Sequence, residues 1–207
     1  MSLRSEVPQD RAAPPVPVKI VVSGGFGVGK TTAIGALSDI EPLTTEAAMT
    51  SAGVGVDDRG QRDRKTTTTV AFDFGRVTIS SDIVLFMFGT PGQDRFGFMW
   101  ADLLDGALGG IVLVDTDRIS DCFVAIDYYE QVGLPFVVAV NQFEGRDNLG
   151  IDQVRRSTDV DPDVPVVAVD ARDRESTKQL VLTLLDLLLR RAQAARGRPP
   201  VDPAGPV

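Results

Sequence analysis

The sequence predicts a mixed α/β fold in which a mostly parallel six-stranded sheet, with one antiparallel edge strand, carries helices on both faces. Short apolar runs alternate with segments of helical periodicity along most of the 207 residues, which is the pattern of a doubly wound sheet. Two of these runs, residues 66–79 and 83–88, are separated only by a Ser-Ser-Asp turn. That spacing is typical of a hairpin and accounts for the antiparallel strand.

Each element follows from its own pattern. The expected strands are the apolar runs at residues 18–22, 66–79, 83–88, 111–114, 136–140 and 164–169. The expected helices are residues 32–37, 95–108, 119–131 and 175–195. The leucine stripe of the last helix indicates core packing, because it is too short for a coiled coil. Trp100 is likewise expected in the core.

The chain is expected to form one domain over residues 17–195, between disordered tails at residues 1–16 and 196–207, the second of them rich in proline. Residues 40–65 have no sustained period and are expected to form a long irregular loop. Their basic cluster, within residues 59–65, fits a solvated surface better than contacts with phosphates or a partner, although both remain open.

Composition excludes several classes of function. The chain has no histidine and a single cysteine, Cys122, so imidazole catalysis, histidine metal sites and an internal disulfide are excluded. A formal net charge of −8 argues against nucleic acid or an anionic membrane as partners. No signal peptide, membrane-spanning run or lipidation motif is found. We expect a cytoplasmic protein that reaches the inner face of the membrane only through partners.

The chemistry is concentrated in the stretch Gly24-Gly25-Phe26-Gly27-Val28-Gly29-Lys30-Thr31, which matches the phosphate-binding pattern G-x-x-x-x-G-K-T. It lies between a predicted strand and a predicted helix, as that loop requires. Glycines let the backbone N–H groups point at the phosphates. Lys30 supplies a mobile charge, and the Thr31 hydroxyl is placed to bind Mg²⁺. The predicted phosphate-binding residues are Gly25, Gly27, Val28, Gly29, Lys30, Thr31 and Thr32.

Loops at other predicted strand ends should face the same crevice. They resemble those of small Ras-like GTPases. Thr90-Pro91-Gly92-Gln93 is similar to the switch II sequence T-A-G-Q, which implies that Gly92 contacts the γ-phosphate and Gln93 orients the attacking water. The threonines at residues 66–69 lie where the Mg²⁺-binding switch I threonine should be, and Thr69 is the predicted ligand.

The base-recognition loops also resemble that family. Asn141-Gln142-Phe143-Glu144 is similar to the guanine-reading N-K-x-D, and Asp170-Ala171-Arg172 is similar to S-A-K, whose alanine N–H meets guanine O6. The resemblance covers residues 17–195 and implies a small-GTPase version of the P-loop NTPase fold, with GTP or GDP and Mg²⁺ as ligands. The implied base-binding residues are Asn141, Gln142, Glu144, Ala171 and Arg172.

Within that superfamily, the strings SGGFGVGKTT, EPLTTEAAMTSAGVGVDD, KTTTTVAFDFG and FGTPGQDRFGFMW resemble the GTPases of actinobacterial conservon (Cvn) operons, which are related to MglA. That resemblance implies a Roadblock/LC7-type partner, a complex with a sensor-kinase-like protein and a role in bacterial signalling.

Several positions depart from the Ras-like pattern. Gly89 stands where an aspartate holds Mg²⁺ through water, which implies weaker metal binding in the diphosphate state. Phe26 replaces a glycine near the γ-phosphate, and its ring should obstruct the attacking water and slow hydrolysis. Glu144 and Gln142 replace the aspartate and lysine that read the base, although a carboxylate at 144 can still accept two guanine donors.

No strong arginine finger is visible in the sequence. Arg64, Lys65 and Arg95 are candidates, and Arg95 is preferred because it follows Gln93 by two residues. The predicted catalytic residues are Gln93, Lys30 and Arg95.

Three functions remain open at this point. The favoured one is a GTP-binding switch with slow hydrolysis. A nucleotide-binding scaffold with negligible hydrolysis is supported by Gly89 and Phe26. A P-loop ATPase or small-molecule kinase is disfavoured by Asn141 and Glu144.

Overall fold

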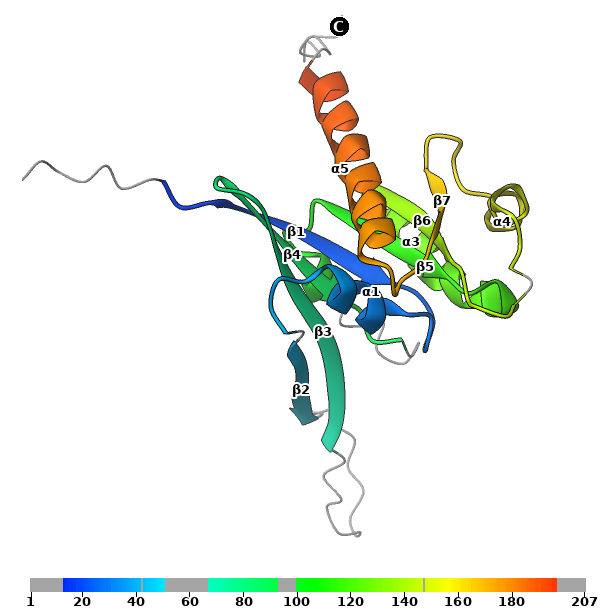
Figure 1. The fold of residues 1–207 in the computed structure, drawn as a ribbon, viewed down its shortest axis with the longest axis horizontal. Helices are drawn as coiled ribbons and strands as arrows, with labels where there is room; N and C mark the ends of the chain where they lie inside the picture. Colours follow the sequence, from blue (N-terminus) through cyan, green and yellow to red (C-terminus); the bar gives the residue numbers. More distant parts are fainter. Residues whose placement is uncertain (1–12, 42, 51–66, 93–99, 147, 197–207) are drawn as a thin grey trace, which may run out of the picture.

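The computed structural model describes residues 13–41, 43–50, 67–92, 100–146 and 148–196, and of residues 43–50 and 67–71 it describes the backbone alone. The elements, shown in Figure 1, are β1 (Val16–Ser23), α1 (Lys30–Leu37), β2 (Leu43–Thr50), β3 (Thr67–Ser80), β4 (Ile83–Gly89), α2 (Trp100–Leu104), β5 (Gly109–Val114), the 3-10 segment η2 (Thr116–Cys122), α3 (Phe123–Val132), β6 (Phe136–Asn141), α4 (Ile151–Thr158), β7 (Val166–Val169) and α5 (Arg174–Arg196). All six strands expected from the apolar runs are present.

The strands form one sheet of seven in the order β2-β3-β4-β1-β5-β6-β7. The pairings of β1 with β4 and β5, of β5 with β6 and of β6 with β7 are parallel, whereas β3 runs antiparallel to both β4 and β2. This mostly parallel sheet, with its phosphate loop between β1 and α1, confirms the predicted α/β fold of P-loop NTPases.

β2 is an addition to the predicted sheet. The segment 40–65 was expected to be irregular, but its first part pairs along β3, from Leu43 opposite Phe74 to Thr50 opposite Thr67. β3 has 14 residues and β4 has 7, so β3 extends past its inner neighbour. The extended edge offers unpaired N–H and C=O groups, which β2 satisfies. The antiparallel strand therefore lies inside the sheet instead of at its edge.

The hairpin of β3 and β4 contains a register shift. Ser80 lies opposite Ile83, but Thr78 lies opposite Val84, so Ile79 is an extra residue on β3 and forms a bulge. From there the shifted register continues to the other end of the hairpin, where Asp73 lies opposite Gly89.

Two apolar layers cover the sheet. On one face α1 and α5 pack over the central strands, around Ile34, Leu180 and Leu184. On the other face α2, α3 and α4 enclose a second cluster that includes the fully buried Tyr129 and the buried Trp100, as expected for the latter. The C-terminal part of α5 extends clear of the sheet (Figure 1).

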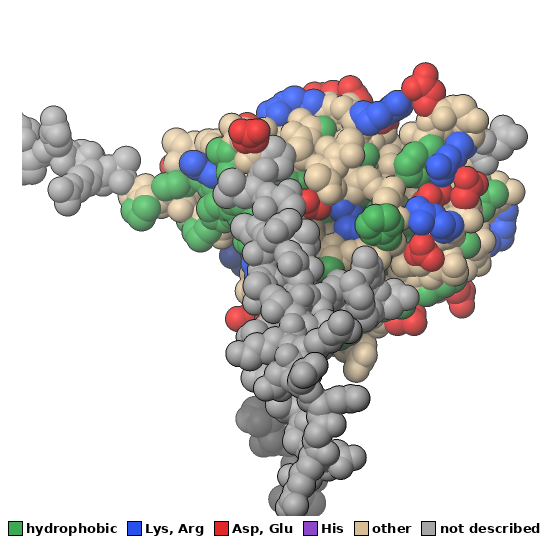
Figure 2. Space-filling view, turned by 90° about the horizontal axis from the view of Figure 1, so that it is seen from below, with side chains coloured by type: hydrophobic (Ala, Val, Ile, Leu, Met, Phe, Trp, Pro, Cys, Tyr) green, Lys and Arg blue, Asp and Glu red, His purple; other side chains and the backbone are tan. Residues whose placement is uncertain are grey.

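The helices agree with the prediction except at α2, at α4 and at residues 119–122, which belong to the 3-10 segment η2 ahead of α3. Of the helix expected at 95–108, residues 95–99 lie outside the described part, and α2 ends at Leu104, four residues before the expected end. α4 is a further helix that periodicity did not reveal, since only Val154 and Thr158 of it are buried. None of the helices in the described ranges is long and apolar enough to cross a membrane. On the face seen in Figure 2, basic and acidic side chains lie interspersed beside the grey atoms.

Candidate nucleotide site

The phosphate loop has the strand-to-helix setting that its pattern requires. β1 ends at Ser23 and α1 begins at Lys30, with Gly29 at the N-cap in a left-handed conformation, φ 105°. A Cβ atom at position 29 would also lie 2.8 Å from Asn141 Nδ2. Glycine is therefore needed at this position both for its backbone conformation and for space.

Lys30 is held inside the loop. Its Nζ donates hydrogen bonds to the carbonyl oxygens of Gly24 and Gly25, each at 2.8 Å, and the residue is 7% exposed. Burial lowers the pKa of Lys30 to about 8, with the negative charge of Asp73 acting in the opposite direction. The ammonium is thus poised for an anionic ligand, whose charge would offset its desolvation.

A cavity of about 480 Å³ lies in front of the loop. It is lined by residues of the loop and the first turn of α1, by Asp73 of β3, and by Thr90, Pro91 and Gly92 beyond β4. Gly92 approaches so closely that a Cβ atom there would lie 2.8 Å from Phe26 Cα and 2.9 Å from Lys30 Nζ. The structure therefore brings Gly92 to the phosphate loop, where the sequence comparison placed it.

Asp73 is a site residue that sequence reasoning missed. Its Oδ2 accepts a hydrogen bond of 2.6 Å from the Thr31 hydroxyl. A Cβ atom at Gly89 would lie 3.2 Å from the same Oδ2. The carboxylate on β3 thus fills the space of the side chain that Gly89 lacks on β4. The signal in the sequence was an acidic residue between Phe72 and Phe74 in an apolar strand.

Asn141 connects the phosphate loop to the base-recognition loops. Its Nδ2 donates to the Val28 carbonyl at 2.9 Å, and its Oδ1 accepts from the Ala171 N–H at 3.1 Å. The side chain is buried. One amide therefore joins the ends of β6 and β7 to the loop after β1. The Ala171 N–H, which the resemblance assigned to the base, is paired with Asn141 in this structure.

The other base-recognition residues form exposed contacts. Arg172 Nη1 donates to Glu144 Oε2 at 2.9 Å, and Arg172 Nη2 donates to Asp170 Oδ2 at 2.9 Å. These partners, Asp170 first, raise the pKa of Arg172 above its ordinary value. Gln142, in contrast, turns back on its own strand and donates to the Val140 carbonyl at 3.1 Å. The structure brings Glu144 and Arg172 together, but not Gln142.

Other predicted residues are not placed by the structure. Gln93, Arg95, Arg64 and Lys65 lie outside the described residues. The backbone of Thr69 lies in β3, opposite Ala48 and four residues before Asp73, which corresponds to about 13 Å along a strand. Thr69 as a metal ligand stays a prediction, one that requires this end of β3 to take another path.

The fold and this cavity together define a P-loop nucleotide-binding protein. A family model described as "Conserved hypothetical ATP binding protein" matches residues 22–191, and the chain belongs to that family. The chain is also similar to the "Uncharacterized protein MJ1339" of Methanocaldococcus jannaschii, with 32% identity over 127 residues, which are 60% of this chain and 70% of that protein.

Proposed function

We propose that this protein is a guanine-nucleotide-binding switch that hydrolyses GTP slowly. The observation that carries the proposal is the placement of Asn141, which ties the phosphate loop to both base-recognition loops through a single buried amide. Such a connection holds the phosphate loop and the base-recognition loops in one arrangement, so that one nucleotide can be bound across both. Nucleotide binding as such is supported by the family match.

Guanine is favoured by the residue types at the base end. Asn141 retains a second amide hydrogen for the base, and the Glu144 carboxylate has lone pairs beyond those that Arg172 uses. Guanine offers two adjacent N–H donors to such a carboxylate, whereas adenine does not. Glu144 is 84% exposed, so its contact with Arg172 can rearrange when a base arrives at little cost.

Thr31 and Asp73 fit a Mg²⁺ ion bound with the nucleotide. A hydroxyl and a carboxylate oxygen 2.6 Å apart form the hard donor set that Mg²⁺ prefers, with the ion held directly or through water. When bound, the ion would neutralise charge on the phosphate oxygens. Asp73 thereby supplies the carboxylate whose loss at Gly89 had implied weak metal binding.

The chain's own residues would then bind and orient the phosphates. The Lys30 ammonium and the loop N–H groups neutralise the anion, and the Gly92 backbone closes the cavity over it. Slow hydrolysis is supported by Phe26, which lines this cavity and is 68% exposed, so that its ring is available to obstruct the attacking water. In this proposal Gln93 orients the attacking water, and Arg95 stabilises the charge that develops on the phosphates during hydrolysis. A Phe26→Gly protein that hydrolyses GTP no faster would contradict the obstruction by the ring.

ATP is the second candidate ligand. The family description names ATP, and in this structure the Glu144 carboxylate already has a cationic partner in Arg172. A base that needs no carboxylate could bind without disturbing that pair.

The deciding experiment compares binding of mant-GDP and mant-ADP to the purified protein with Mg²⁺. We expect the wild type to prefer mant-GDP and Glu144→Gln to reduce that preference about tenfold, with binding of mant-ADP unchanged. Glu175→Gln is the matched control, because Glu175 is likewise an exposed glutamate paired with a cation, Lys178 on α5. Equal or adenine-preferring binding by the wild type would replace the first candidate by the second.

The signalling role is proposed on the resemblance to conservon GTPases alone. It predicts that a Roadblock/LC7-type protein, presented together with its sensor-kinase-like partner, binds the GTP form better than the GDP form. Turnover measured with and without that partner separates a cycling switch from a scaffold: unchanged and negligible turnover in both cases would favour the scaffold.

A further inference from the structure

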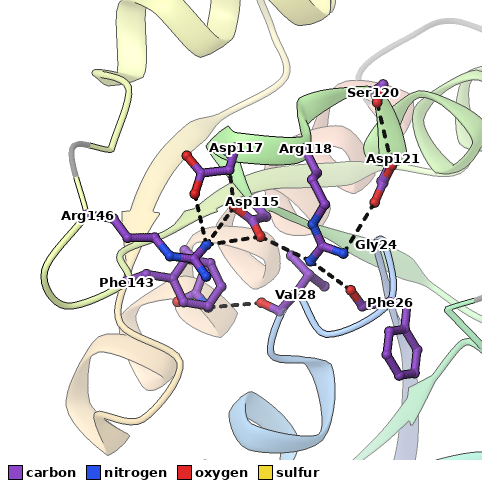
Figure 3. Close-up of polar contacts among 12 residues, drawn as sticks. Gly24, Phe26, Val28, Asp115, Asp117, Arg118, Ser120, Asp121, Phe143 and Arg146 are labelled. Carbon is purple, nitrogen blue, oxygen red and sulfur yellow. Dashed lines mark hydrogen bonds and ion pairs between the residues drawn. The ribbon is translucent and has the colours of Figure 1, made fainter.

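A chain of charged side chains runs beside the nucleotide site and is used by none of the roles assigned so far (Figure 3). Its centre is Asp115, which follows β5 and has a side chain only 5% exposed. Two arginines contact it, Arg118 from η2 at 3.1 Å and Arg146 from the loop after β6 at 3.3 Å. A buried carboxylate shared by two arginines from different loops fixes those loops relative to one another.

Arg118 connects this centre to the phosphate loop. Its Nη2 donates to the Phe26 carbonyl oxygen at 2.9 Å and to Asp115 Oδ2 at 3.1 Å. Its backbone dihedrals, φ −137° and ψ 50°, interrupt the helical conformation of η2. The side chain thus reaches the loop from a local kink, with the guanidinium anchored on both sides.

This contact determines the direction of one donor in the loop. The peptide between Phe26 and Gly27 is trans, so its C=O and N–H point in opposite directions. Arg118 holds the carbonyl oxygen outward. The Gly27 N–H is therefore turned toward the other side of the loop, and Gly27 lines the phosphate cavity.

The η2 segment supports the loop at a second point. A Cβ atom at Gly25 would lie 2.6 Å from the Cβ atom of Asp121, and one at Gly27 would lie 3.7 Å from Arg118 Nη2. The loop and η2 are packed backbone against side chain, which leaves the peptide after Phe26 little freedom to rotate.

At its other end the chain of contacts reaches the base-recognition loop. Arg146 Nη1 lies 3.2 Å from Asp117 Oδ2 as well as 3.3 Å from Asp115. Its guanidinium carbon lies 4.4 Å from the centroid of the Phe143 ring, a cation–π contact. Phe143 stands between Asn141 and Glu144, so the carboxylate that orients Arg118 is also connected, through Arg146, to the loop proposed to read the base.

We propose that Arg118 is a positioning residue that aims the Gly27 N–H at the nucleotide phosphates, and that Asp115 and Arg146 couple this alignment to the base-recognition loop. The inference rests on the proposed nucleotide binding at this site. Because Asp115 largely neutralises the charge of Arg118, Arg118 acts mainly on the geometry and polarity of the peptide after Phe26. Long-range attraction of the guanidinium for the phosphates contributes less. A guanidinium on the carbonyl also strengthens the opposite N–H as a donor.

The test compares the wild type, Arg118→Gln, Arg118→Lys and the matched control Arg155→Gln. Arg155 also donates from Nη2 to a backbone carbonyl, that of Val164 at 2.9 Å, but it lies on α4. The readouts are the affinity for mant-GDP with Mg²⁺, the chemical shift of the Gly27 amide proton in a ¹⁵N-labelled protein, and the melting temperature.

We expect Arg118→Gln to weaken mant-GDP binding about tenfold and to reduce the downfield shift of the Gly27 amide on binding. Arg118→Lys should restore part of both effects, and Arg155→Gln should change neither. If the wild type binds mant-GDP and Arg118→Gln shows the same affinity or the same Gly27 shift on binding, the inference is overturned. A loss of affinity in Arg118→Gln that merely follows a loss of melting temperature would overturn it as well. A wild type that binds neither mant-GDP nor mant-ADP would instead refute the proposed function itself.

Discussion

The phosphate end and the base end of the candidate site are built differently. At the phosphate end Lys30 is buried and Asp73 is bonded to Thr31 within a cavity. At the base end Glu144 and Arg172 pair on the surface, with side chains 84% and 56% exposed. Buried charged groups have few alternative arrangements, whereas exposed pairs can exchange partners freely. Under the proposed function, the rigid end would set the class of ligand and the adaptable end the identity of the base.

The largest expected effect comes from removing the buried charge. Lys30→Met should weaken mant-GDP binding roughly 100-fold, because it removes a charge-assisted contact with the phosphates. The melting temperature should not fall, because the ammonium is desolvated in the free protein. Lys178→Met, an exposed lysine on α5, is the control. If the affinity of Lys30→Met for mant-GDP lay within threefold of the wild-type value, the phosphate end could not be the main determinant of nucleotide affinity.

The next effect concerns the metal. Asp73→Asn should reduce by about tenfold the gain in mant-GDP affinity that Mg²⁺ provides, because an amide is a weaker partner for the cation and its waters than a carboxylate. Titrations with Mg²⁺ and with EDTA separate the two contributions, and Asp82→Asn in the hairpin turn serves for comparison. If the variant lost as much affinity in EDTA as in Mg²⁺, Asp73 would be acting on the loop and not on the metal.

A smaller effect should appear with pH. The pKa of Lys30 in the free protein is about 8, whereas a bound phosphate would keep the lysine protonated. Above pH 8 binding must take up a proton, so affinity should fall about fourfold between pH 7 and 8.5. Calorimetry in buffers of different ionisation enthalpy would detect that proton. The free protein should become more stable as pH rises from about 8 toward the unfolded value of 10.5, because only the unfolded lysine keeps its proton there. A flat affinity profile would contradict the shifted pKa.

The smallest effect belongs to the exposed end. Arg172→Ala should leave the melting temperature unchanged and alter mant-GDP affinity by less than about threefold, since exposed ion pairs contribute little. The measurement is a titration beside a thermal melt. A large loss of stability would show that the base end is as rigid as the phosphate end and would remove the contrast between them.

Sequence reasoning predicted the parts of the fold that depend on local pattern. Apolar runs predicted six of the seven strands, all but β2, and the phosphate loop was visible because each of its positions has its own chemical requirement. β2 was missed because its partner is the far end of a longer strand. Arg118 and Asp73 were missed for a related reason: their roles depend on which chain segments become neighbours, and no local pattern encodes that.

The bulge at Ile79 has a consequence for how this site tolerates change. If Ile79 paired with Val84 instead of forming a bulge, β3 would slip by one position, and Phe74 would lie opposite Gly89 where Asp73 now lies. The bulge lies roughly 20 Å along the strand from Asp73, beside a surface turn of the kind at which insertions and deletions are usually tolerated. Here a single-residue deletion at the turn would absorb the bulge and leave Asp73 opposite Gly89. Loss of the bulge at unchanged length would instead exchange the carboxylate for a phenyl ring at the phosphate cavity, so a bulge in a remote hairpin is itself part of the site's chemistry.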